Sequence, residues 1–308
     1  MNTTSIPKTV TLNNGIEMPM FGMGTYLIPQ LEHVLYESIK NGVRLIDTAW
    51  YYKNEKEVGL AINKAIADKI VERKDLFVMT KVWITRKHDP EASLVEQLKD
   101  LNLTYVDMYI DHFPFQINMV DDKEIKTPRH VFWKNMEGLV KKGLTKSIGV
   151  SNYNVQALVD VLSYCEIKPA VNQVEFHPYL HQTGLLEFCN LHGVRVVAYN
   201  SLCRGKYTTI LHKEGTKNLL EEPVVIETAK KYGKSAAQIA LNWALAQGLI
   251  VIPSSSKTER MKENLQSDTF VMSKDDIENI GKLNHAYRFV TGDMLSALIP
   301  GLKGDIFA

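Results

Sequence analysis

The chain has 308 residues, of which 45% are hydrophobic and 23% charged, a composition typical of a globular protein with a sizeable core. This composition excludes intrinsic disorder and fibrous architecture. The 36 Lys and Arg residues nearly balance the 35 Asp and Glu residues, so the net charge of +1 gives no general attraction for nucleic acid or anionic lipid. We therefore expect a small-molecule ligand, and neither nucleic acid nor a membrane as a partner.

The N-terminal residues lack the apolar segment of a secretory signal, and no stretch approaches the roughly 20 apolar residues of a transmembrane helix. Three cysteines, Cys165, Cys189 and Cys203, show no CxxC spacing. Their number and spacing support neither a disulfide framework nor a thiolate zinc site, so we interpret them as reduced and mostly structural. We expect a cytoplasmic protein and, because no apolar stripe indicates an obligate partner, a monomer.

Short apolar, β-branched runs alternate along the chain with segments of helical period. The first residues differ, because TVTL, NNG and IEMP (9–19) predict a hairpin, which we expect to cover one end of the fold. Strands are predicted at 20–26, 44–49, 77–83, 106–113, 147–152, 171–176, 195–202 and 250–255. Helices are predicted at 31–41, 55–67, 91–101, 129–142, 154–163, 182–192, 221–232, 235–247 and 274–286.

Near-continuous apolar strands separated by helices predict a parallel sheet covered by helices. Eight such strands in about 250 residues are typical of an α/β (β/α)8 TIM barrel, with a doubly wound open sheet as the alternative. No linker divides the chain, so we expect a single (β/α)8 barrel domain over 1–308, with an N-terminal β-hairpin and extra helices. Longer connections at 114–128 and 203–220, and the tail after about 287, are the expected places for substrate selection.

Several familiar motifs are missing or incomplete. GMGT (22–25) resembles the start of a dinucleotide-binding glycine motif, but Leu27 stands where the third glycine is required, so a strand-end turn explains these glycines better. No phosphate-binding loop, HExxH or GxSxG motif is present. His177, His181 and His192 show no ligand spacing, and we interpret them as structural or surface residues, so no metal site is predicted.

Polar residues interrupt three apolar strands near their C-terminal ends: Asp47, Lys81 and His112, with Tyr52 in the loop after Asp47. Charge in such places is costly unless it is paired or functional, and these ends meet at one rim of a barrel. A buried lysine beside a carboxylate would lower the pKa of a nearby phenol from about 10, making Tyr52 a general acid for a carbonyl oxygen, with His112 as a second donor. A structural ion pair at the rim is the alternative.

Six motifs resemble those of the aldo-keto reductases, in order along the chain. GVRLIDTAWYYKNEKEVGLAI (42–62) resembles the family signature DTAxxYxNExxVG, and it is followed by MTKVW (79–83), YVDMYIDHFP (105–114), IGVSNY (148–153), VNQVEFHPYL (171–180) and VIPSSSKTERMKEN (251–264). The resemblance extends from about residue 8 to about 290. It implies a catalytic tetrad of Asp47, Tyr52, Lys81 and His112, in which Tyr52 donates the proton. Tyr51, off the motif spacing, is then a pocket wall.

The same resemblance implies an extended nicotinamide dinucleotide bound across the rim without a Rossmann domain. It assigns Ser151, Asn152 and Gln173 to the carboxamide and Tyr199 to stacking on the nicotinamide ring. These residue types suit the task, because amides and hydroxyls can bond a carboxamide while an aromatic face holds one side of the ring. The further cofactor contacts that it implies are Thr25, Asp47, Leu202, Ser255, Arg260, Glu263 and Asn264.

One departure bears on the choice of cofactor. Most family members that prefer the phosphorylated form have lysine after the proline of IPKS, where this chain has Ser254. Arg260 is retained, and Lys257 would share a helical face with it in a helix opening at about 257, whose N–H groups would face the 2′-phosphate. We expect NADPH as the cofactor, with NADH as a weaker alternative.

The implied substrate pocket is aromatic and largely apolar, which suits aldehydes and ketones, and is lined by Tyr26, Tyr51, Trp83, His112 and Phe113. We predict an NADPH-dependent oxidoreductase of the aldose reductase or alcohol dehydrogenase (NADP+) type that reduces carbonyls to alcohols without a metal. A cofactor-binding regulatory or structural barrel with little turnover is one alternative. A metal-dependent hydrolase is another, which Lys81 and the lack of an HxH pair disfavour. Sugar, steroid, prostaglandin and lipid substrates all remain open.

Overall fold

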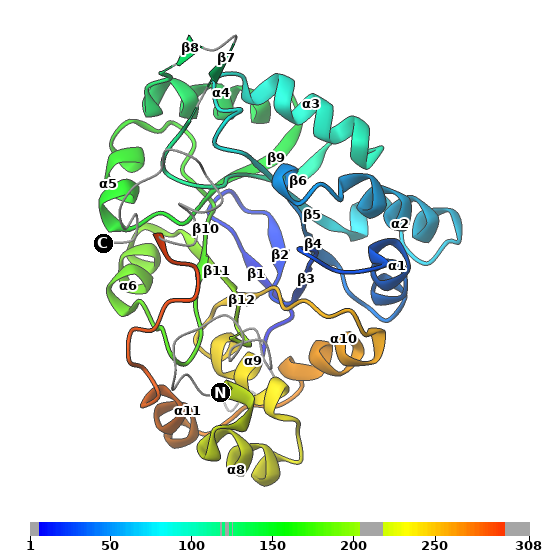
Figure 1. The fold of residues 1–308 in the computed structure, drawn as a ribbon, viewed down its shortest axis with the longest axis vertical. Coiled ribbons are helices and arrows are strands. Elements are labelled where there is room, and N and C mark those ends of the chain that lie inside the picture. Colours follow the sequence, from blue (N-terminus) through cyan, green and yellow to red (C-terminus); the bar gives the residue numbers. More distant parts are fainter. Residues whose placement is uncertain (1–5, 118, 121–122, 125, 204–217, 293–308) are drawn as a thin grey trace.

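The computed structural model describes residues 6–117, 119–120, 123–124, 126–203 and 218–292. Figure 1 shows strands at the centre of the molecule and helices around them. Eight strands form one parallel sheet in the order β12-β11-β10-β9-β6-β5-β4-β3. Their bounds are β3 Gly22–Gly24, β4 Leu45–Asp47, β5 Phe77–Val82, β6 Val106–Asp111, β9 Thr145–Ser151, β10 Val171–Glu175, β11 Arg195–Tyr199 and β12 Ile250–Val251.

The sheet is closed on itself. Phe21, just before β3, forms a parallel bridge with Val251 of β12, and the N–H of Val251 donates to the carbonyl oxygen of Met20 at 2.9 Å. This closure excludes the doubly wound open sheet and confirms the (β/α)8 barrel predicted from the alternation of apolar runs and helical segments. Each of the eight predicted strands contributes to it.

Ten α-helices of the described residues surround or extend the barrel: α1 Leu31–Lys40, α2 Glu55–Ala67, α3 Pro90–Leu101, α4 Arg129–Lys141, α5 Val155–Tyr164, α6 Thr183–His192, α8 Pro223–Tyr232, α9 Ala236–Leu245, α10 Thr258–Asn264 and α11 Lys274–Gly281. Their amphipathic spacing explains their packing; in α1, Leu31, Val34, Leu35 and Ile39 are buried at helical intervals. Caps define several starts, as where the Asp89 side chain accepts from the Ala92 N–H before α3.

The N-terminal hairpin closes one end of the barrel, as expected. Strand β1 (Thr9–Thr11) pairs antiparallel with β2 (Glu17–Pro19). In the turn, Asn13 donates to the carbonyl oxygen of Pro169 at 2.9 Å and Asn14 to the hydroxyl of Ser147 at 2.8 Å, both at the N-terminal ends of barrel strands. The opposite end, where the strands finish, is therefore the end available for a site.

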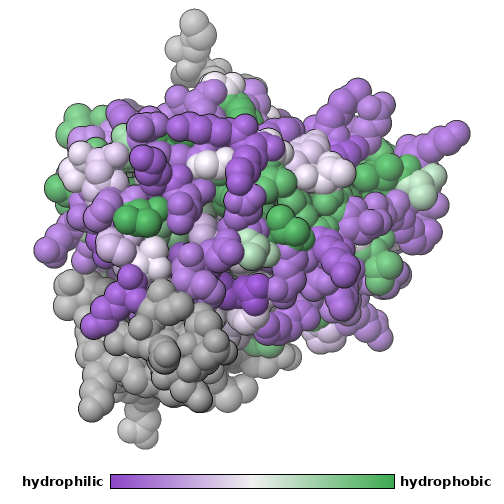
Figure 2. Space-filling view, turned by 90° about the horizontal axis from the view of Figure 1, so that it is seen from above, coloured by the Kyte–Doolittle hydropathy of each residue, from purple (hydrophilic) through white to green (hydrophobic). Residues whose placement is uncertain are grey.

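The long connection at 114–128 contains a short antiparallel pair that the sequence analysis did not predict, β7 (Met119–Val120) with β8 (Lys123–Glu124). Most of the expected loop at 203–220 and the tail from 293 onward lie outside the described residues. No described helix is long and apolar enough to cross a membrane. On the face drawn in Figure 2, hydrophilic side chains predominate among the described residues, with apolar ones between them.

Candidate active site

The four residues of the predicted tetrad come from three adjacent strands and one short turn. Asp47 ends β4, Lys81 is the penultimate residue of β5, and His112 directly follows β6. Tyr52 ends the 3-10 turn η1 (Trp50–Tyr52), which stops at Lys53 in a left-handed conformation. Because the strands are parallel and neighbouring, their C-terminal ends bring these side chains to one rim.

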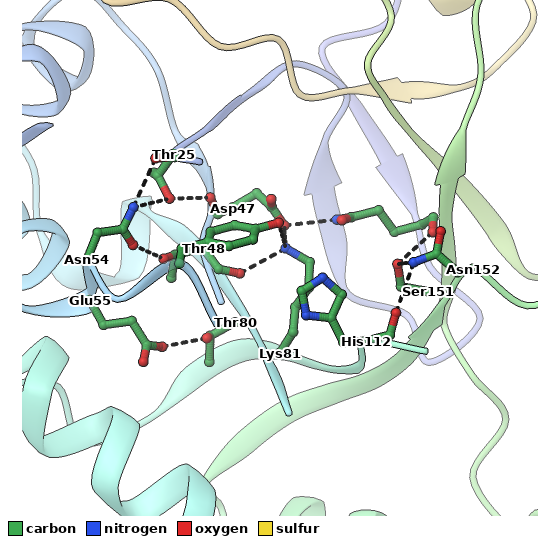
Figure 3. A network of polar contacts seen from close by, with 12 residues as sticks. Thr25, Asp47, Thr48, Asn54, Glu55, Thr80, Lys81, His112, Ser151 and Asn152 are labelled. Atoms are coloured by element: carbon green, nitrogen blue, oxygen red, sulfur yellow. Dashed lines mark hydrogen bonds and ion pairs between the residues drawn. The ribbon is translucent and has the colours of Figure 1, made fainter. Parts of the chain in front are cut away.

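The ammonium of Lys81 lies at the centre of this group (Figure 3). Its side chain has no exposed surface, and Nζ lies 2.6 Å from Asp47 Oδ1, 2.9 Å from the carbonyl oxygen of Thr48 and 3.2 Å from the Tyr52 hydroxyl. Three acceptors match the three protons of an ammonium. Because the Tyr52 oxygen accepts from Lys81, the phenol's own proton can be donated to another group.

The pKa of Tyr52 shifts against the expectation. Lys81 was expected to lower the phenol pKa, but burial and then the Asp47 carboxylate raise the pKa of Tyr52 well above 10. Burial also lowers the pKa of Lys81, against the opposing effect of Asp47. Tyr52 therefore holds its proton at neutral pH, as a proton donor requires.

His112 is held as a neutral imidazole. Burial, together with the charges of Lys81 and Lys87, lowers the pKa of His112 well below 6.5. Its Nδ1 is buried and has no hydrogen-bond partner among the described residues. The imidazole lies edge-on to the Tyr52 ring, with centroids 5.9 Å apart. The backbone carbonyl oxygen of His112 accepts a hydrogen bond from the Asn152 amide at 3.0 Å, which fixes the peptide that carries the ring.

The residues assigned to the nicotinamide end lie beside the tetrad. Gln173 of β10 donates to Asp47 Oδ1 at 2.9 Å. Asn152 donates to the Ser151 hydroxyl at 3.1 Å and accepts from the Tyr199 hydroxyl at 2.8 Å. The structure thus places these hydroxyl, amide and aromatic groups together, at the C-terminal ends of β9 and β11 and in the middle of β10. Such a set fits a carboxamide and a flat ring.

Two other predicted cofactor residues lie nearby. Thr25, just after β3, is buried and donates to the carbonyl oxygen of Asp47 at 3.0 Å. Its own carbonyl oxygen accepts from the Asn54 amide at 2.9 Å, so Asn54, which the sequence analysis did not single out, supports this corner of the site. Leu202 is half-buried after β11 and packs against the core.

The remaining predicted cofactor residues follow β12. Ser255 is half-buried in the connection to α10, while Arg260 and Glu263 are exposed on α10 and Asn264 is buried at its end. The helix begins at Thr258, with Lys257 at the N-cap in an extended conformation. Lys257 therefore does not share a helical face with Arg260, contrary to the expectation. The helix opens at the predicted place, but the lysine precedes it.

The predicted pocket residues form an aromatic group separate from the main core. Tyr51 stacks on Trp83 with centroids 4.0 Å apart, Trp83 meets Phe113 edge-on at 5.9 Å, and Tyr26 lies 4.9 Å from the Tyr52 ring. Trp83 and Phe113 are buried, whereas Tyr26 is 38% exposed. Five further members of this group were not predicted from the sequence, because they carry no polar signal: Trp50, Ile84, Phe115, Ile117 and Val290.

Glu175 is a buried carboxylate that the sequence analysis also missed. It ends β10 and accepts hydrogen bonds from the backbone N–H groups of Phe289 (3.1 Å) and Val290 (2.9 Å), from Asn200 (2.8 Å) and from His177 (3.1 Å). Burial favours the neutral acid, but the hydrogen bonds outweigh it and lower the pKa of the carboxyl. Glu175 therefore ties the tail that carries Val290 to the barrel.

The histidines interpreted as structural lie away from the tetrad. His177 is fully buried against Glu175, His181 packs against Trp243 with centroids 4.8 Å apart, and half-buried His192 packs against Phe188. Across the residues that the structure describes, no group of three or more His, Cys, Asp or Glu side chains could hold a metal ion.

Comparisons with known proteins agree with this geometry. The family model described as "Aldo/keto reductase family" matches residues 29–285. An NAD(P)H-dependent D-xylose reductase of Candida tropicalis is 38% identical over 312 aligned residues, covering 94% of this chain and 96% of the relative. An NADPH-dependent aldose reductase of Saccharomyces cerevisiae is also 38% identical, covering 91% and 94%. The solved aldose reductase of Schistosoma japonicum superposes with a TM-score of 0.85 at 31% identity, covering 94% and 97%.

Proposed function

Because this chain belongs to the aldo/keto reductase family, we propose that it is an NADPH-dependent oxidoreductase that reduces the carbonyl group of aldehydes or ketones to an alcohol, with Tyr52 as the proton donor. The observation that carries the mechanism is the position of one ammonium. Lys81 Nζ lies 2.6 Å from Asp47 and 3.2 Å from the Tyr52 hydroxyl. The names of the relatives support the reaction and the cofactor.

Tyr52 supplies the proton that the carbonyl oxygen needs as it gains negative charge. The raised pKa keeps the phenol protonated until that charge develops. When the proton leaves, the phenolate oxygen already accepts a hydrogen bond from Lys81, whose positive charge stabilises it. Asp47 holds the lysine in place from the other side. The ion pair is thus proposed as part of the chemistry as well as of the structure.

His112 orients the carbonyl. Its low pKa keeps it neutral, and Nδ1 has no acceptor among the described residues, so we place its proton on Nε2. An Nε2–H group can donate to the same oxygen that Tyr52 protonates. Trp83, Phe113 and Tyr51 form apolar walls that exclude water and strengthen both hydrogen bonds.

The cofactor, when bound, supplies the hydride for the carbonyl carbon. We propose that Ser151, Asn152 and Gln173 bind its carboxamide and that Tyr199 lies against one face of its ring. Ser255, Arg260, Glu263 and Asn264 would hold the adenosine end, with Thr25 and Leu202 between. Arg260 is a cation for the 2′-phosphate, which supports NADPH over NADH, while Ser254 lacks the second charge and leaves NADH as a weaker alternative.

The substrate is proposed to be a small aldehyde or ketone, and open-chain aldoses are the first to test because relatives are named xylose and aldose reductases. We further propose that residues 1–308 form a single domain and that the protein is a cytoplasmic monomer. The lack of a cysteine pairing pattern supports the cytoplasmic location, and the near-neutral net charge, which gives no sign of a partner, supports the monomer.

Replacing Tyr52 tests the mechanism. Tyr52→Phe should lower kcat for NADPH-dependent aldehyde reduction by about 10²–10⁴-fold, with NADPH affinity and unfolding unchanged. Tyr51→Phe is the matched control, because it removes a neighbouring hydroxyl but keeps the ring on Trp83. Near wild-type turnover in Tyr52→Phe would exclude this proton donor. A wild-type protein that binds NADPH but reduces none of a panel of aldoses, aldehydes and ketones would instead be a regulatory barrel.

A further inference from the structure

A second buried lysine lies beside the site, outside the tetrad. Lys87, in the connection after β5, is 3% exposed, and Asp111 at the end of β6 is fully buried. Lys87 Nζ lies 2.6 Å and 2.7 Å from the two carboxylate oxygens of Asp111. The hydroxyl of Tyr153, also buried, donates to Asp111 at 2.7 Å. These three residues, the Lys87 cluster, contact none of the reacting groups, and in the chemistry above only the charge of Lys87 enters, through the pKa of His112.

The Lys87 cluster holds both neighbours of His112. Besides binding the Asp111 side chain, Lys87 Nζ donates to the carbonyl oxygen of Phe113 at 2.5 Å. One ammonium therefore connects the residue before the imidazole with the residue after it. The intervening peptide is fixed as well, since the His112 N–H donates to the carbonyl oxygen of Val82 at 3.3 Å and its carbonyl oxygen accepts from Asn152.

The rings that depend on this segment face the reacting groups. The imidazole of His112 stacks on the Phe113 ring with centroids 5.2 Å apart, and both meet Trp83 edge-on. Lys87 lies four residues after Trp83, so the same connection carries a pocket wall and the ammonium that fixes the opposite wall. A shift of Phe113 would move the imidazole with it.

A buried ion pair is a poor device for stability alone. Removing two charges from water is costly, and well-packed apolar residues of similar volume often serve as well or better. Apolar residues could fill the space behind β6, but they could not form hydrogen bonds to a carbonyl oxygen and a carboxylate. Lys87 forms both from one ammonium group and so restrains residues 111 and 113 together.

We propose that Lys87 and Asp111, with Tyr153, are positioning residues of the active site, which fix His112 and Phe113 so that the imidazole faces Tyr52 across the aromatic pocket. This inference rests on the carbonyl reduction proposed above. It assigns a role in turnover to residues that contact neither the carbonyl nor the cofactor. Displacement of a catalytic group by about 1 Å can lower a rate by about 10²-fold, so a small loosening should be measurable.

The test replaces the whole cluster by apolar residues of similar shape. In Lys87→Met/Asp111→Leu/Tyr153→Phe no buried charge or hydroxyl is left without a partner, so the folded state should persist. We expect kcat per NADPH-binding chain to fall at least about tenfold and KM for the aldehyde to rise severalfold, because His112 and Phe113 both lose their restraint. NADPH affinity should fall less than kcat does, since the side chains of the cluster bond Asp111 and Phe113 and not the side chain of a proposed cofactor residue, and Tyr153→Phe leaves the backbone next to Asn152 unchanged.

A matched control uses the other end of the same strand. Arg73 lies 2.8 Å from Asp107, near the start of β6 and far from the tetrad in the strand. Arg73→Met/Asp107→Asn should change the unfolding midpoint but neither kcat nor KM. If the triple variant lost activity only through lower stability, the Arg73→Met/Asp107→Asn variant would lose activity in the same way.

The outcomes are distinguishable. Wild-type kcat and KM in the triple variant would overturn the positioning role. If the triple variant does not fold, the single variant Asp111→Asn replaces it, because asparagine keeps the volume and an acceptor for Lys87. This variant should also lower kcat and raise KM severalfold. Wild-type kcat and KM in Asp111→Asn would overturn the positioning role equally. If the wild-type enzyme reduces no carbonyl compound, the proposed function fails and not the positioning.

Discussion

Gln173 and Asp47 are joined across the interior of the barrel. The amide Nε2 of Gln173, from β10, donates to Oδ1 of Asp47, from β4, at 2.9 Å. The same carboxylate oxygen accepts from Lys81 at 2.6 Å. One oxygen therefore connects the ion pair beside Tyr52 with an amide proposed to bind the carboxamide.

Gln173→Met should weaken NADPH binding by about tenfold, the value of one hydrogen bond of ordinary strength, while Lys81 and Asp47 stay paired. Quenching of protein fluorescence on titration with NADPH measures the change. Gln97→Met is the control, because Gln97 is a buried amide that bonds Glu55 and Tyr109 on the helix side of β5. It should lower stability without changing NADPH affinity, and an equal loss of affinity in both variants would contradict the assignment.

Ser254→Lys should increase the preference for NADPH over NADH by about tenfold, because a charge-assisted hydrogen bond to the 2′-phosphate adds affinity for one cofactor only. Ser254 is exposed, so the longer side chain has room. Arg260→Ala should shift the preference the other way. The ratio of kcat/KM for the two cofactors is the measurement, with Lys262→Ala on the same helix as control. An NADH preference in the wild type would refute the proposed selectivity.

The buried carboxyl group of Glu55 should make the free energy of unfolding depend on pH. Burial raises the pKa of Glu55 from 4.5 to about 6, so the folded chain binds more protons than the unfolded chain in this interval and stability falls as pH rises through it. The Glu55 oxygen accepts from Thr80 and Gln97, bonds that a glutamine oxygen can keep. Glu55→Gln should therefore be more stable than wild type above pH 6, by up to about 2 kcal/mol, and should lose the advantage below pH 4.5.

Denaturant unfolding at several pH values from 4 to 8, a range that brackets the shifted pKa of about 6, tests this expectation. Glu57→Gln is the control, since Glu57 is an exposed carboxylate on the same helix. A stability difference between Glu55→Gln and wild type that does not change with pH would rule out the buried carboxylate as its source.

Glu175→Gln should loosen the tail at Phe289 and Val290. The amide has one oxygen where the carboxylate has two, and its NH₂ group would face N–H donors. We therefore expect the free energy of unfolding to fall by about 1–3 kcal/mol. Amide hydrogen exchange at 289 and 290 should accelerate, and KM for apolar aldehydes should rise more than kcat falls, because Val290 packs against the aromatic group proposed to line the substrate site. Glu187 is exposed, so the control Glu187→Gln should leave hydrogen exchange, KM and kcat unchanged. Unchanged exchange in Glu175→Gln would show that the tail is held by other contacts.

The barrel and the tetrad could be predicted because their signals are local. Apolar strands alternate with helical segments, and Asp47, Lys81 and His112 stand out as polar residues at strand ends. Glu175 has the same signal at the end of β10. Two of its four partners, however, are backbone N–H groups of residues 289 and 290, which cannot be recognised from residue types.

The direction of the Tyr52 pKa could not be predicted either. Burial and then the Asp47 carboxylate raise the pKa of Tyr52, although its oxygen accepts a hydrogen bond from Lys81. Spacing reveals which charges meet but not how much water remains around them. The role of Lys87 was hidden for a related reason, because a lysine in a loop is usually exposed and only the fold returns it to β6.

The hydrogen bonds of Glu175 join segments that are made at different times. Residues 289 and 290 follow all eight strands, so during synthesis the strands and the proposed proton donor Tyr52 leave the ribosome before Val290 does. A chain cleaved just before residue 289 would keep all four residues of the proposed tetrad but lose Val290 from the aromatic group. We therefore expect such a cleavage to affect substrate selection before it affects proton transfer.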